Sequence, residues 1–217
     1  MLLKFFFDRI VSFIGLLIIW PLLLVIALLV KFKIRGSVIF VQERIGRDGK
    51  PFLIHKFRTM TNEDGVSSPV TMAGESRITS LGAKLRHYKL DELPELWDVL
   101  IGKMSFVGPR PDVAGYADLL KDDDRDMLRL CPGITGPASL KYRNEEELIA
   151  DYVHQAKVKG DNRSEQDIAL WYNDTVLWPD KVRINCYYYR HYSFFKDIQM
   201  IFATILGRKM LYGGEEI

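Results

Sequence analysis

Asp91 and Glu92 are adjacent carboxylates just ahead of Pro94, in the stretch KLDELPELWD at Lys89–Asp98. Proline is tolerated in the first turn of a helix, where its missing N–H has no partner to lose, so the two acids are predicted to lie at a helix entrance. A carboxylate with a pKa near ~4 is ionised at neutral pH and can attack phosphorus without a general base. Two neighbouring acids can then divide the work, because one can attack while the other holds a metal ion.

The same stretch also has a purely structural interpretation. Acidic side chains cap helix N-termini and interact favourably with the helix dipole, and most Asp-Glu pairs before a helix do only this. Apolar residues recur here at helical spacing and predict a buried stripe, with acids on the opposite face. The stripe comprises Leu93, Leu96, Trp97 and Leu100, and the acids are Asp91, Glu95 and Asp98.

An anionic nucleophile needs cations around it, because its target phosphate is also an anion. At ~4 Å and an effective dielectric constant of ~20, the repulsion costs about 4 kcal/mol for each charge pair. Lys56 and Arg58 are expected to project from one side of a strand, Arg86 from a helix, and Arg110 from a stiff loop between two prolines. We expect these four residues and a Mg²⁺ ion to offset the repulsion.

The elements that would position these residues indicate an α+β fold, mostly helical with a small β-hairpin. Ser37–Gly46 and Phe52–Met60 are β-rich and flank the turn signal GRDGK, which predicts the hairpin. Asn62–Arg77 is rich in Gly, Ser, Asn and Asp, which indicates a mobile loop or a lid. The prolines of Ser105–Val113 argue against regular structure there. Helices are predicted over Thr79–Tyr88, Ala114–Leu130 and Glu145–Lys159.

The amino terminus contains a hydrophobic segment long enough to cross a bilayer. Ile10–Val30 carries no charge, and at ~1.5 Å per residue a straight helix of that length measures roughly 30 Å. A signal peptide is disfavoured because Lys31, Lys33 and Arg35 follow where a small-residue cleavage site would stand. Residues 1–35 are therefore predicted to be a retained membrane anchor, and residues 36–217 a cytoplasmic domain.

Positive charges flank both ends of this segment, with Lys4 and Arg9 before it and three basic residues after it. Positive residues favour the cytoplasmic side, and a straight spanning helix cannot place both of its ends there. Pro21 lies near the midpoint and removes one backbone hydrogen bond, so it can kink the helix. We favour a re-entrant, monotopic hairpin, with an ordinary span as the alternative because Pro kinks also occur in spanning helices.

The carboxyl-terminal region has an amphipathic pattern. Cys186–Met210 interleaves aromatic and basic residues and then places apolar side chains on one helical face. Helices that lie at a bilayer surface have this pattern, and so do helices packed on a protein's own core, so both interpretations stay open. The face comprises Phe194, Ile198, Ile201, Phe202 and Ile205.

Composition and charge argue against several other classes of protein. Thirty basic and 28 acidic residues give a net charge of +2, unlike the strongly basic surface of nucleic-acid-binding proteins. Cys131 and Cys186 form no C-x-x-C pair and the four His residues form no H-E-x-x-H motif, which fits an intracellular protein without zinc. Asp122–Asp124 could be the D-x-D metal motif of nucleotide-sugar glycosyltransferases, but we favour a solvated helix face because no nucleotide-binding βαβ unit precedes it.

Five segments, in this order and spacing, resemble the bacterial sugar transferases that are small monotopic phosphoglycosyl transferases. They are KFRTM (Lys56–Met60), RITSLGAKLRHYKLDELPEL (Arg77–Leu96), DVLIGKMSFVGPRP (Asp98–Pro111), CPGITG (Cys131–Gly136) and YSFFKDIQMIFATI (Tyr192–Ile205). The likeness covers nearly the whole chain. It implies transfer of a phosphosugar from a UDP-sugar to a polyprenol phosphate such as undecaprenyl phosphate, with release of UMP, at the cytoplasmic face of the bacterial inner membrane.

The resemblance also implies roles for individual residues. Asp91 corresponds to the nucleophile that forms a covalent phosphosugar intermediate, and Glu92 to the Mg²⁺ ligand. Lys56, Arg86 and Arg110 correspond to the basic residues of the family's site. The implied partners are a UDP-sugar, undecaprenyl phosphate and inner-membrane lipids, with no nucleic acid.

This chain departs from the family's common pattern at several positions, and some properties stay open. Glu95 and Asp98 stand where Gln and Asn are common, and Trp20 precedes Pro21 where a small polar residue is frequent. The sequence identifies neither the transferred sugar nor the oligomeric state. A homo-oligomer therefore stays open. Two other functions stay as alternatives: a non-catalytic membrane-anchored scaffold, and a metal-dependent phosphatase that uses the same two acids.

Overall fold

The computed structural model describes residues 1–61 and 77–217, so the loop or lid predicted at Asn62–Arg77 lies, except for Arg77, outside the described residues. The fold is α+β and mostly helical, as the sequence predicts. The helices are α1 (Leu2–Lys33), α2 (Ser80–His87), α3 (Glu95–Leu100), α4 (Pro137–Lys141), α5 (Glu145–Val158), α6 (Glu165–Tyr172), α7 (Trp178–Arg190) and α8 (Phe194–Leu206). The strands are β1 (Ile39–Ile45), β2 (Pro51–Phe57), β3 (Ser105–Val107), β4 (Gly133–Thr135), β5 (Leu211–Tyr212) and β6 (Glu215–Glu216).

The predicted hairpin is confirmed. Strands β1 and β2 pair antiparallel, with Ile45 opposite Pro51 at the turn. The turn itself is a short 3-10 helix in which Asp48 and Gly49 have φ values of 60° and 75°. Asp and Gly tolerate this left-handed backbone better than most residues, which is why the GRDGK sequence reverses the chain here.

Strands β3 and β4 form a parallel pair, in which Ser105 lies opposite Gly133. This pair corrects the expectation that Ser105–Val113 contains no regular structure, because the strand ends before the first proline of that segment. Gly108 follows β3 and packs closely on the partner segment, where an added Cβ would lie 2.2 Å from the Cys131 carbonyl oxygen. The close packing fixes the point at which the loop carrying Arg110 leaves the sheet.

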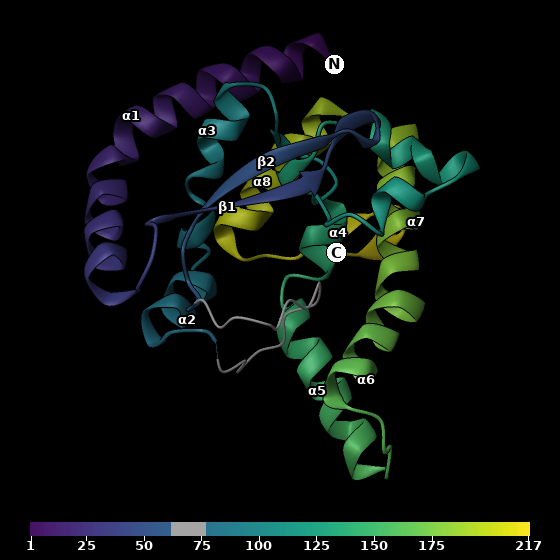
Figure 1. Cartoon of the computed structure of the whole chain (residues 1–217). Coiled ribbons are helices and arrows are strands. Elements are labelled where there is room, and N and C mark those ends of the chain that lie inside the picture. Colours follow the sequence, from purple (N-terminus) through teal and green to yellow (C-terminus); the bar gives the residue numbers. More distant parts are fainter. Residues whose placement is uncertain (62–76) are drawn as a thin grey trace.

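Other predicted helices are confirmed in part. Helices α2 and α5 match the expected segments within two residues. Ala114–Leu130 is not one helix, since it forms two separate 3-10 helices at Ala117–Leu119 and Asp122–Arg129. Helices α5 and α6 project from the body of the molecule as a helical hairpin (Figure 1).

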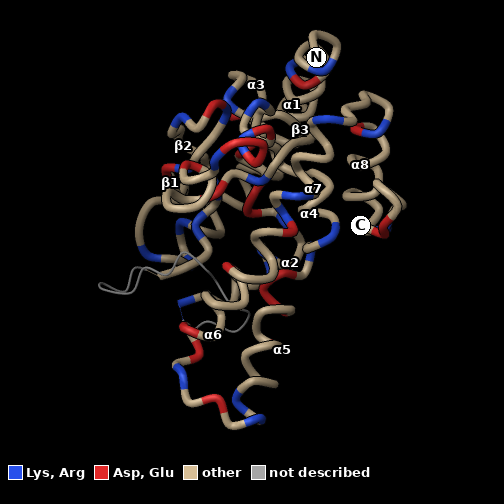
Figure 2. The backbone as a smooth tube through the Cα atoms, turned by 90° about the vertical axis from the view of Figure 1, so that its right-hand side faces the viewer, with Lys and Arg blue, Asp and Glu red and all other residues tan. Residues whose placement is uncertain are grey.

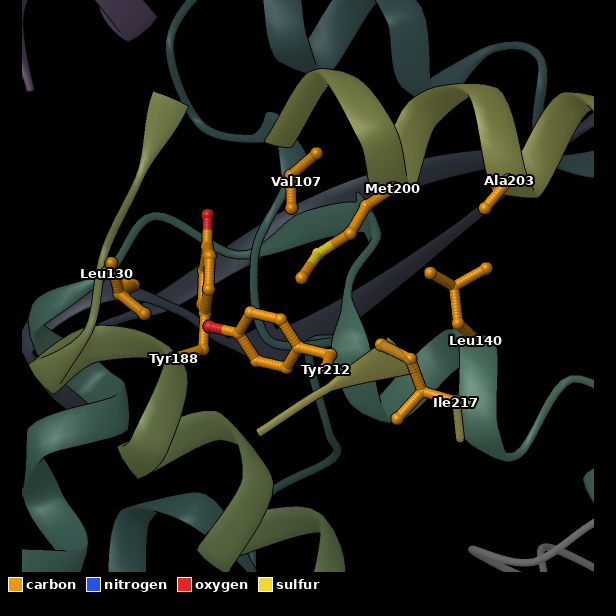
Figure 3. Close-up of a cluster of buried hydrophobic side chains, with 8 residues drawn as sticks. All are labelled: Val107, Leu130, Leu140, Tyr188, Met200, Ala203, Tyr212 and Ile217. Atoms are coloured by element: carbon orange, nitrogen blue, oxygen red, sulfur yellow. The ribbon is translucent and has the colours of Figure 1, made fainter. Parts of the chain in front are cut away.

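The largest buried cluster lies between α7, α8 and the short carboxyl-terminal strands. Tyr188 and Met200 are fully buried at its centre, and Val107 links it to β3 (Figure 3). The remaining members are Leu130, Leu140, Ala203, Tyr212 and Ile217. This cluster anchors β3, and therefore the start of the Arg110 loop, to the carboxyl-terminal helices.

Helix α1 runs along one side of the fold and changes direction part-way along its length (Figure 1). It is long and apolar enough to cross a membrane, and Pro21 is the only proline inside it. Many of its apolar side chains are exposed in the middle of the helix, such as Leu17, Ile18 and Trp20. A lipid environment would cover these side chains, whereas water would not.

Both ends of α1 contact the rest of the chain. Near the amino terminus, Lys4 Nζ lies 2.6 Å from Asp197 Oδ2 of α8, and Asp8 Oδ2 accepts a hydrogen bond of 2.7 Å from Ser105 Oγ. Lys4 and Asp8 are buried, so these contacts are not surface ion pairs. At the other end, a cluster of buried apolar residues joins α1 to β2 and α2. It comprises Ile26, Val30, Ile34, Phe57 and Leu85.

Helix α8 fits both interpretations of its amphipathic pattern. Met200 and Ala203 pack into the core, whereas Phe195, Phe202 and Ile205 are 80%, 58% and 72% exposed. One face therefore packs on the protein itself, and another presents large apolar side chains at the surface.

Candidate active site

Asp91 and Glu92 lie in a one-turn 3-10 helix, Leu90–Glu92, between α2 and α3. Lys89 precedes this turn with a φ of 54°, in the left-handed region, and this conformation reverses the chain after α2. Pro94 lies immediately before α3. The acids are therefore one turn ahead of the helix and not in its first turn, because the reversal at Lys89 starts a separate turn.

The acids of this segment are buried, contrary to the prediction, and Leu93, Leu96 and Leu100 of the expected stripe are only half-buried. Glu95 and Asp98 are 2% and 0% exposed, whereas Trp97 of the expected buried stripe is 51% exposed. Asp98 Oδ2 accepts a hydrogen bond of 3.0 Å from the His55 backbone N–H, and its Oδ1 lies 2.8 Å from His55 Nδ1. Buried carboxylates are tolerated when such partners replace water, and hydropathy spacing does not contain this information.

A compact cluster of charges surrounds Glu92. Lys56 Nζ lies 2.9 Å from Glu92 Oε1 and 3.1 Å from Glu95 Oε1. Arg110 Nη2 contacts the same Glu92 oxygen at 2.5 Å. The structure thus brings together β2, the entrance of α3 and the loop after β3, and three of the sequence-predicted site residues meet there.

Arg86 and Arg58, the other two predicted cations, differ in their positions. Arg86 forms an ion pair with Glu146 at the start of α5, and its positive charge acts on Asp91. The Arg58 guanidinium donates hydrogen bonds of 2.8 Å and 2.6 Å to the Ser37 carbonyl and hydroxyl oxygens. Arg58 follows β2 and is bonded to the segment between α1 and β1, so the structure does not bring it into the Glu92 cluster.

The three acids of the site differ in proton affinity. Burial, and then the charge of Glu92, raises the pKa of Asp91, although Lys56 and Arg86 lower it in part. The ordinary carboxyl pKa assumed from the sequence therefore does not hold for Asp91. Burial would also raise the pKa of Glu92, but Arg110 and Lys56 outweigh it and hold that pKa well below its usual range. Burial raises the pKa of Glu95 to about 7 against the opposing effect of Lys56.

Among the residues that the structure describes, two buried polar atoms of the site have no hydrogen-bond partner. They are Oδ1 of Asp91 and Nε of Arg86, one acceptor and one donor. A buried polar atom without a partner is costly, so such atoms in a charged site point to a ligand that completes them. The Asp91 oxygen is available for bond formation.

The donor set also bears on a divalent ion. Among residues 1–61 and 77–217, no group of three or more His, Cys, Asp or Glu side chains could hold a metal by itself. Mg²⁺ commonly binds through one or two carboxylates plus substrate phosphates. Both cations that pair with Glu92 use Oε1, so Glu92 fits a Mg²⁺ ion that one protein carboxylate and a substrate phosphate hold together.

The acidic run Asp122–Asp124 has no comparable surroundings. All three residues are exposed, and the Asp123 side chain is 95% exposed. Figure 2 shows acidic and basic residues distributed over much of the backbone. The interpretation of the run as a solvated surface is therefore favoured over a D-x-D metal site.

Sequence reasoning did not identify Glu95 as part of the site. Glu95 shares Lys56 with Glu92, and the two acids are three residues apart. Side chains at this spacing lie on the same side of a helical turn, so the spacing from Glu92 was the available signal. The predicted apolar stripe concealed it, because that pattern placed Glu95 on the solvent side.

Comparison with known proteins identifies the family. The family model described as bacterial sugar transferase matches residues 1–209, nearly the whole chain. This chain is a bacterial sugar transferase by family. The match contains all five segments on which the sequence resemblance rests, and the charged cluster at Asp91 and Glu92 lies inside it.

Several relatives of this bacterial sugar transferase have names that specify a reaction. A UDP-glucose:undecaprenyl-phosphate glucose-1-phosphate transferase of Klebsiella pneumoniae is 37% identical over 205 residues, which is 91% of this chain and 38% of the relative. A UDP-N-acetylgalactosamine-undecaprenyl-phosphate N-acetylgalactosaminephosphotransferase of Aeromonas hydrophila is 29% identical over 91% of this chain and 41% of the relative. The uncharacterized sugar transferase EpsL of Bacillus subtilis is 32% identical over 97% of this chain and 88% of its own length. The chain thus spans well under half of the first two relatives and most of the third.

Replacement of Glu95 by Gln should remove a pH-dependent loss of stability. Because the pKa of Glu95 rises from 4.5 to about 7 on folding, the folded state loses stability as pH rises through this interval, by up to roughly 3 kcal/mol. Glu95→Gln should therefore be more stable than the wild type at about pH 8 and similar to it at about pH 4. Thermal unfolding in detergent at both pH values measures the difference. Glu147→Gln, at an exposed position, is the control. An equal effect of Glu95→Gln on the unfolding temperature at both pH values would contradict the raised pKa of Glu95.

Proposed function

We propose that this chain is a phosphoglycosyl transferase that moves a sugar 1-phosphate from a UDP-sugar to undecaprenyl phosphate and releases UMP. This reaction would be the first membrane step of surface glycoconjugate synthesis. The observation that carries the proposal is the unpartnered oxygen of buried Asp91, next to a carboxylate that two cations neutralise. The names of the Klebsiella and Aeromonas relatives support this class of reaction and differ in the sugar, so the donor sugar stays unassigned.

In the first step, a carboxylate oxygen of Asp91 attacks the phosphorus atom that carries the sugar. A bond forms between these two atoms, the bond from that phosphorus to the bridging oxygen breaks, and UMP leaves with the electron pair. The ionised form of Asp91 needs no general base, and Lys56 and Arg86 favour this form against the burial that raises its pKa. The product is an aspartyl phosphosugar, which is an acyl phosphate.

In the second step, an oxygen of undecaprenyl phosphate attacks the same phosphorus atom. A new phosphorus–oxygen bond forms, the bond to Asp91 breaks, and the free carboxylate is restored. Because an acyl phosphate is reactive, one UDP-sugar supplies the driving force and ATP is not required. This order of events gives ping-pong kinetics.

The basic residues of the site reduce the repulsion between Asp91 and the phosphates. Lys56 and Arg110 supply fixed charges beside Glu92, and the unpartnered Nε of Arg86 can donate to a phosphate oxygen. A preorganised donor of this kind typically contributes about 3–4 kcal/mol to transition-state stabilisation. We leave Arg58 outside this set because its guanidinium contacts Ser37.

We further propose Glu92 as the protein ligand of a Mg²⁺ ion. When bound, the ion would supply positive charge next to the donor phosphates. The role of Arg110 and Lys56 is to hold Glu92 ionised, which a metal ligand requires, because they keep its pKa well below the usual range. Asp91 then stays available as the nucleophile.

The contacts of α1 support a re-entrant anchor at residues 1–35 and a catalytic domain at residues 36–217. Lys4 near one end of α1 bonds Asp197, and Val30 near the other end packs with Phe57, so both ends contact the same domain. A helix that spans a bilayer separates its ends by about 30 Å and places them on opposite sides. We therefore propose a monotopic protein on the cytoplasmic face of the inner membrane, with the exposed apolar face of α8 at the lipid surface.

Asp91→Asn should abolish a covalent adduct that the wild type forms. Incubation of the full chain with a UDP-sugar, without lipid acceptor, should add one phosphosugar at Asp91, because the second step then has no substrate. Mass spectrometry of the intact chain and of its peptides measures the adduct. Full turnover by Asp91→Asn, or an adduct on another residue, would reject Asp91 as the nucleophile.

The same assay separates the alternative functions. UMP release that depends on undecaprenyl phosphate supports the transferase. Free sugar phosphate in water would indicate the phosphatase, and binding to acidic vesicles without UMP release from any UDP-sugar would indicate the scaffold. A panel of UDP-sugars in this assay also identifies the donor.

Glu92→Gln should weaken the binding of Mg²⁺ to the enzyme. A neutral amide is a poorer ligand for Mg²⁺ than a carboxylate, so the metal concentration for half-maximal UMP release should rise about tenfold or more, or activity should be lost. Glu146→Gln is a control for charge, because Glu146 pairs with Arg86 and lies outside the proposed metal site. An unchanged Mg²⁺ titration in Glu92→Gln would remove this residue from the metal site.

Single cysteines at the two ends of α1 should be labelled from the same side of the membrane. Leu2 and Lys33 are exposed, whereas Lys4 is buried, so Leu2→Cys and Lys33→Cys are suitable positions. Cys131 and Cys186 would first be replaced by Ser. An impermeant maleimide should label both positions in inside-out vesicles and neither in right-side-out vesicles, with detergent-solubilised protein as the control. Labelling of the two positions from opposite sides would establish a spanning helix.

A further inference from the structure

Arg44 of β1 is a cation beside the active site, and it has no acidic partner in the described part of the chain. Its Nε and Nη2 donate hydrogen bonds of 3.0 Å and 2.7 Å to Gln42 Oε1, and its Nη1 donates one of 3.3 Å to the Pro111 carbonyl oxygen. Among the residues that the structure describes, no carboxylate lies within ion-pair distance of its guanidinium. Neutral oxygens hold this side chain in place without neutralising its charge.

Arg44 and Lys56 lie on the same face of the hairpin. Arg44 is opposite Phe52, and Phe52 and Lys56 are an even number of residues apart on β2. Side chains alternate between the two faces of a strand, so these three side chains share the face that carries Lys56 to Glu92.

Arg44 is also tied to the loop that presents Arg110. Its guanidinium contacts the carbonyl of Pro111, the residue after Arg110, and the Ile45 N–H donates a bond of 2.8 Å to the Asp112 carbonyl oxygen. Two guanidinium groups are thus held on adjacent segments, and only Arg110 has a close carboxylate, Glu92.

This arrangement is unfavourable without a ligand. Burial and the charge of Arg110 lower the pKa of Arg44, and nearby acids such as Asp112 offset this effect only in part. A partly buried cation without an ionic partner costs folding free energy. An arginine has five N–H donors, and Arg44 uses three of them, so two remain for an anion.

We propose that Arg44 is a phosphate-binding residue of the active site, which holds a phosphate group of the substrates together with Arg110. The proposal rests on the proposed transferase function. The bound phosphate group could belong to the pyrophosphate of the UDP-sugar or to the lipid phosphate. The KM values for the two substrates distinguish these two sources. Gln42 orients the guanidinium so that its remaining donors face the anion.

Steady-state UMP release by the full chain in lipid nanodiscs tests this role. Arg44→Gln should raise the KM for the UDP-sugar or for undecaprenyl phosphate about tenfold or more, since a charge-assisted bond to phosphate is lost. Arg44→Lys should give a smaller increase, roughly two- to fivefold, because it keeps the charge but not the planar fork. Arg47→Gln, which changes an exposed arginine on the same hairpin, should leave both KM values unchanged.

A second measurement keeps this inference separate from the proposed function. Inorganic pyrophosphate should raise the unfolding temperature of the wild type, and this protection should be lost in Arg44→Gln. If the wild type releases no UMP from any UDP-sugar, the proposed function fails, and this measurement still tests Arg44 as an anion-binding residue.

Two results would overturn the proposal. The first is a change in kcat alone, with wild-type KM values and pyrophosphate protection in Arg44→Gln, because that would make Arg44 only a support for the Arg110 loop. The second result applies if Arg44→Gln does not fold. Arg44→Lys is then the deciding variant, and wild-type KM values and wild-type pyrophosphate protection in Arg44→Lys would reject phosphate binding.

Discussion

The structure depends on the neutralisation of buried carboxylates at the start of α3. An ionised carboxylate that leaves water without a partner costs several kcal/mol, so Glu92 is buried in its ionised form because Lys56 and Arg110 reach it, whereas Glu95 shares only Lys56 and its pKa rises to about 7. These cations come from β2 and from the loop after β3, which are distant in sequence. The site therefore exists only when the hairpin, α3 and the β3–β4 pair are packed together, and a small apolar cluster that includes Ile54 and Val99 holds them there.

The long apolar helix α1 and the charged site form one packed unit. Helix α1 lies against α3, where an added Cβ at Gly15 would be 3.9 Å from the Leu96 side chain. The buried pair between Lys4 and Asp197 connects α1 to α8, and the Asp8–Ser105 bond connects it to β3. Because α3 follows the turn that carries Asp91 and Glu92, the packing of α1 on α3 fixes the position of these acids relative to α1.

The two central acids have different surroundings, and the different roles proposed for them follow from that difference. Glu92 accepts bonds from two cations, which keep it ionised, whereas Asp91 is buried with one oxygen that has no partner. Adjacent residues of similar type thus acquire opposite pKa shifts, raised for Asp91 and lowered for Glu92. The different roles proposed for the two acids, an unpaired carboxylate that attacks and a paired one that is held in place, rest on this difference and not on the residue types.

The sequence by itself determined the hairpin, the helices with clear periodicity, the long apolar helix with its proline, and the residue types of the site, because these follow from local patterns. It did not determine which side of α3 is buried, since Glu95 and Asp98 are inside only because Lys56 and His55 meet them there. Nor did it show that Arg58 contacts Ser37 instead of the acids. Partners from distant segments decide whether a charge can be buried, and only the tertiary structure specifies those partners.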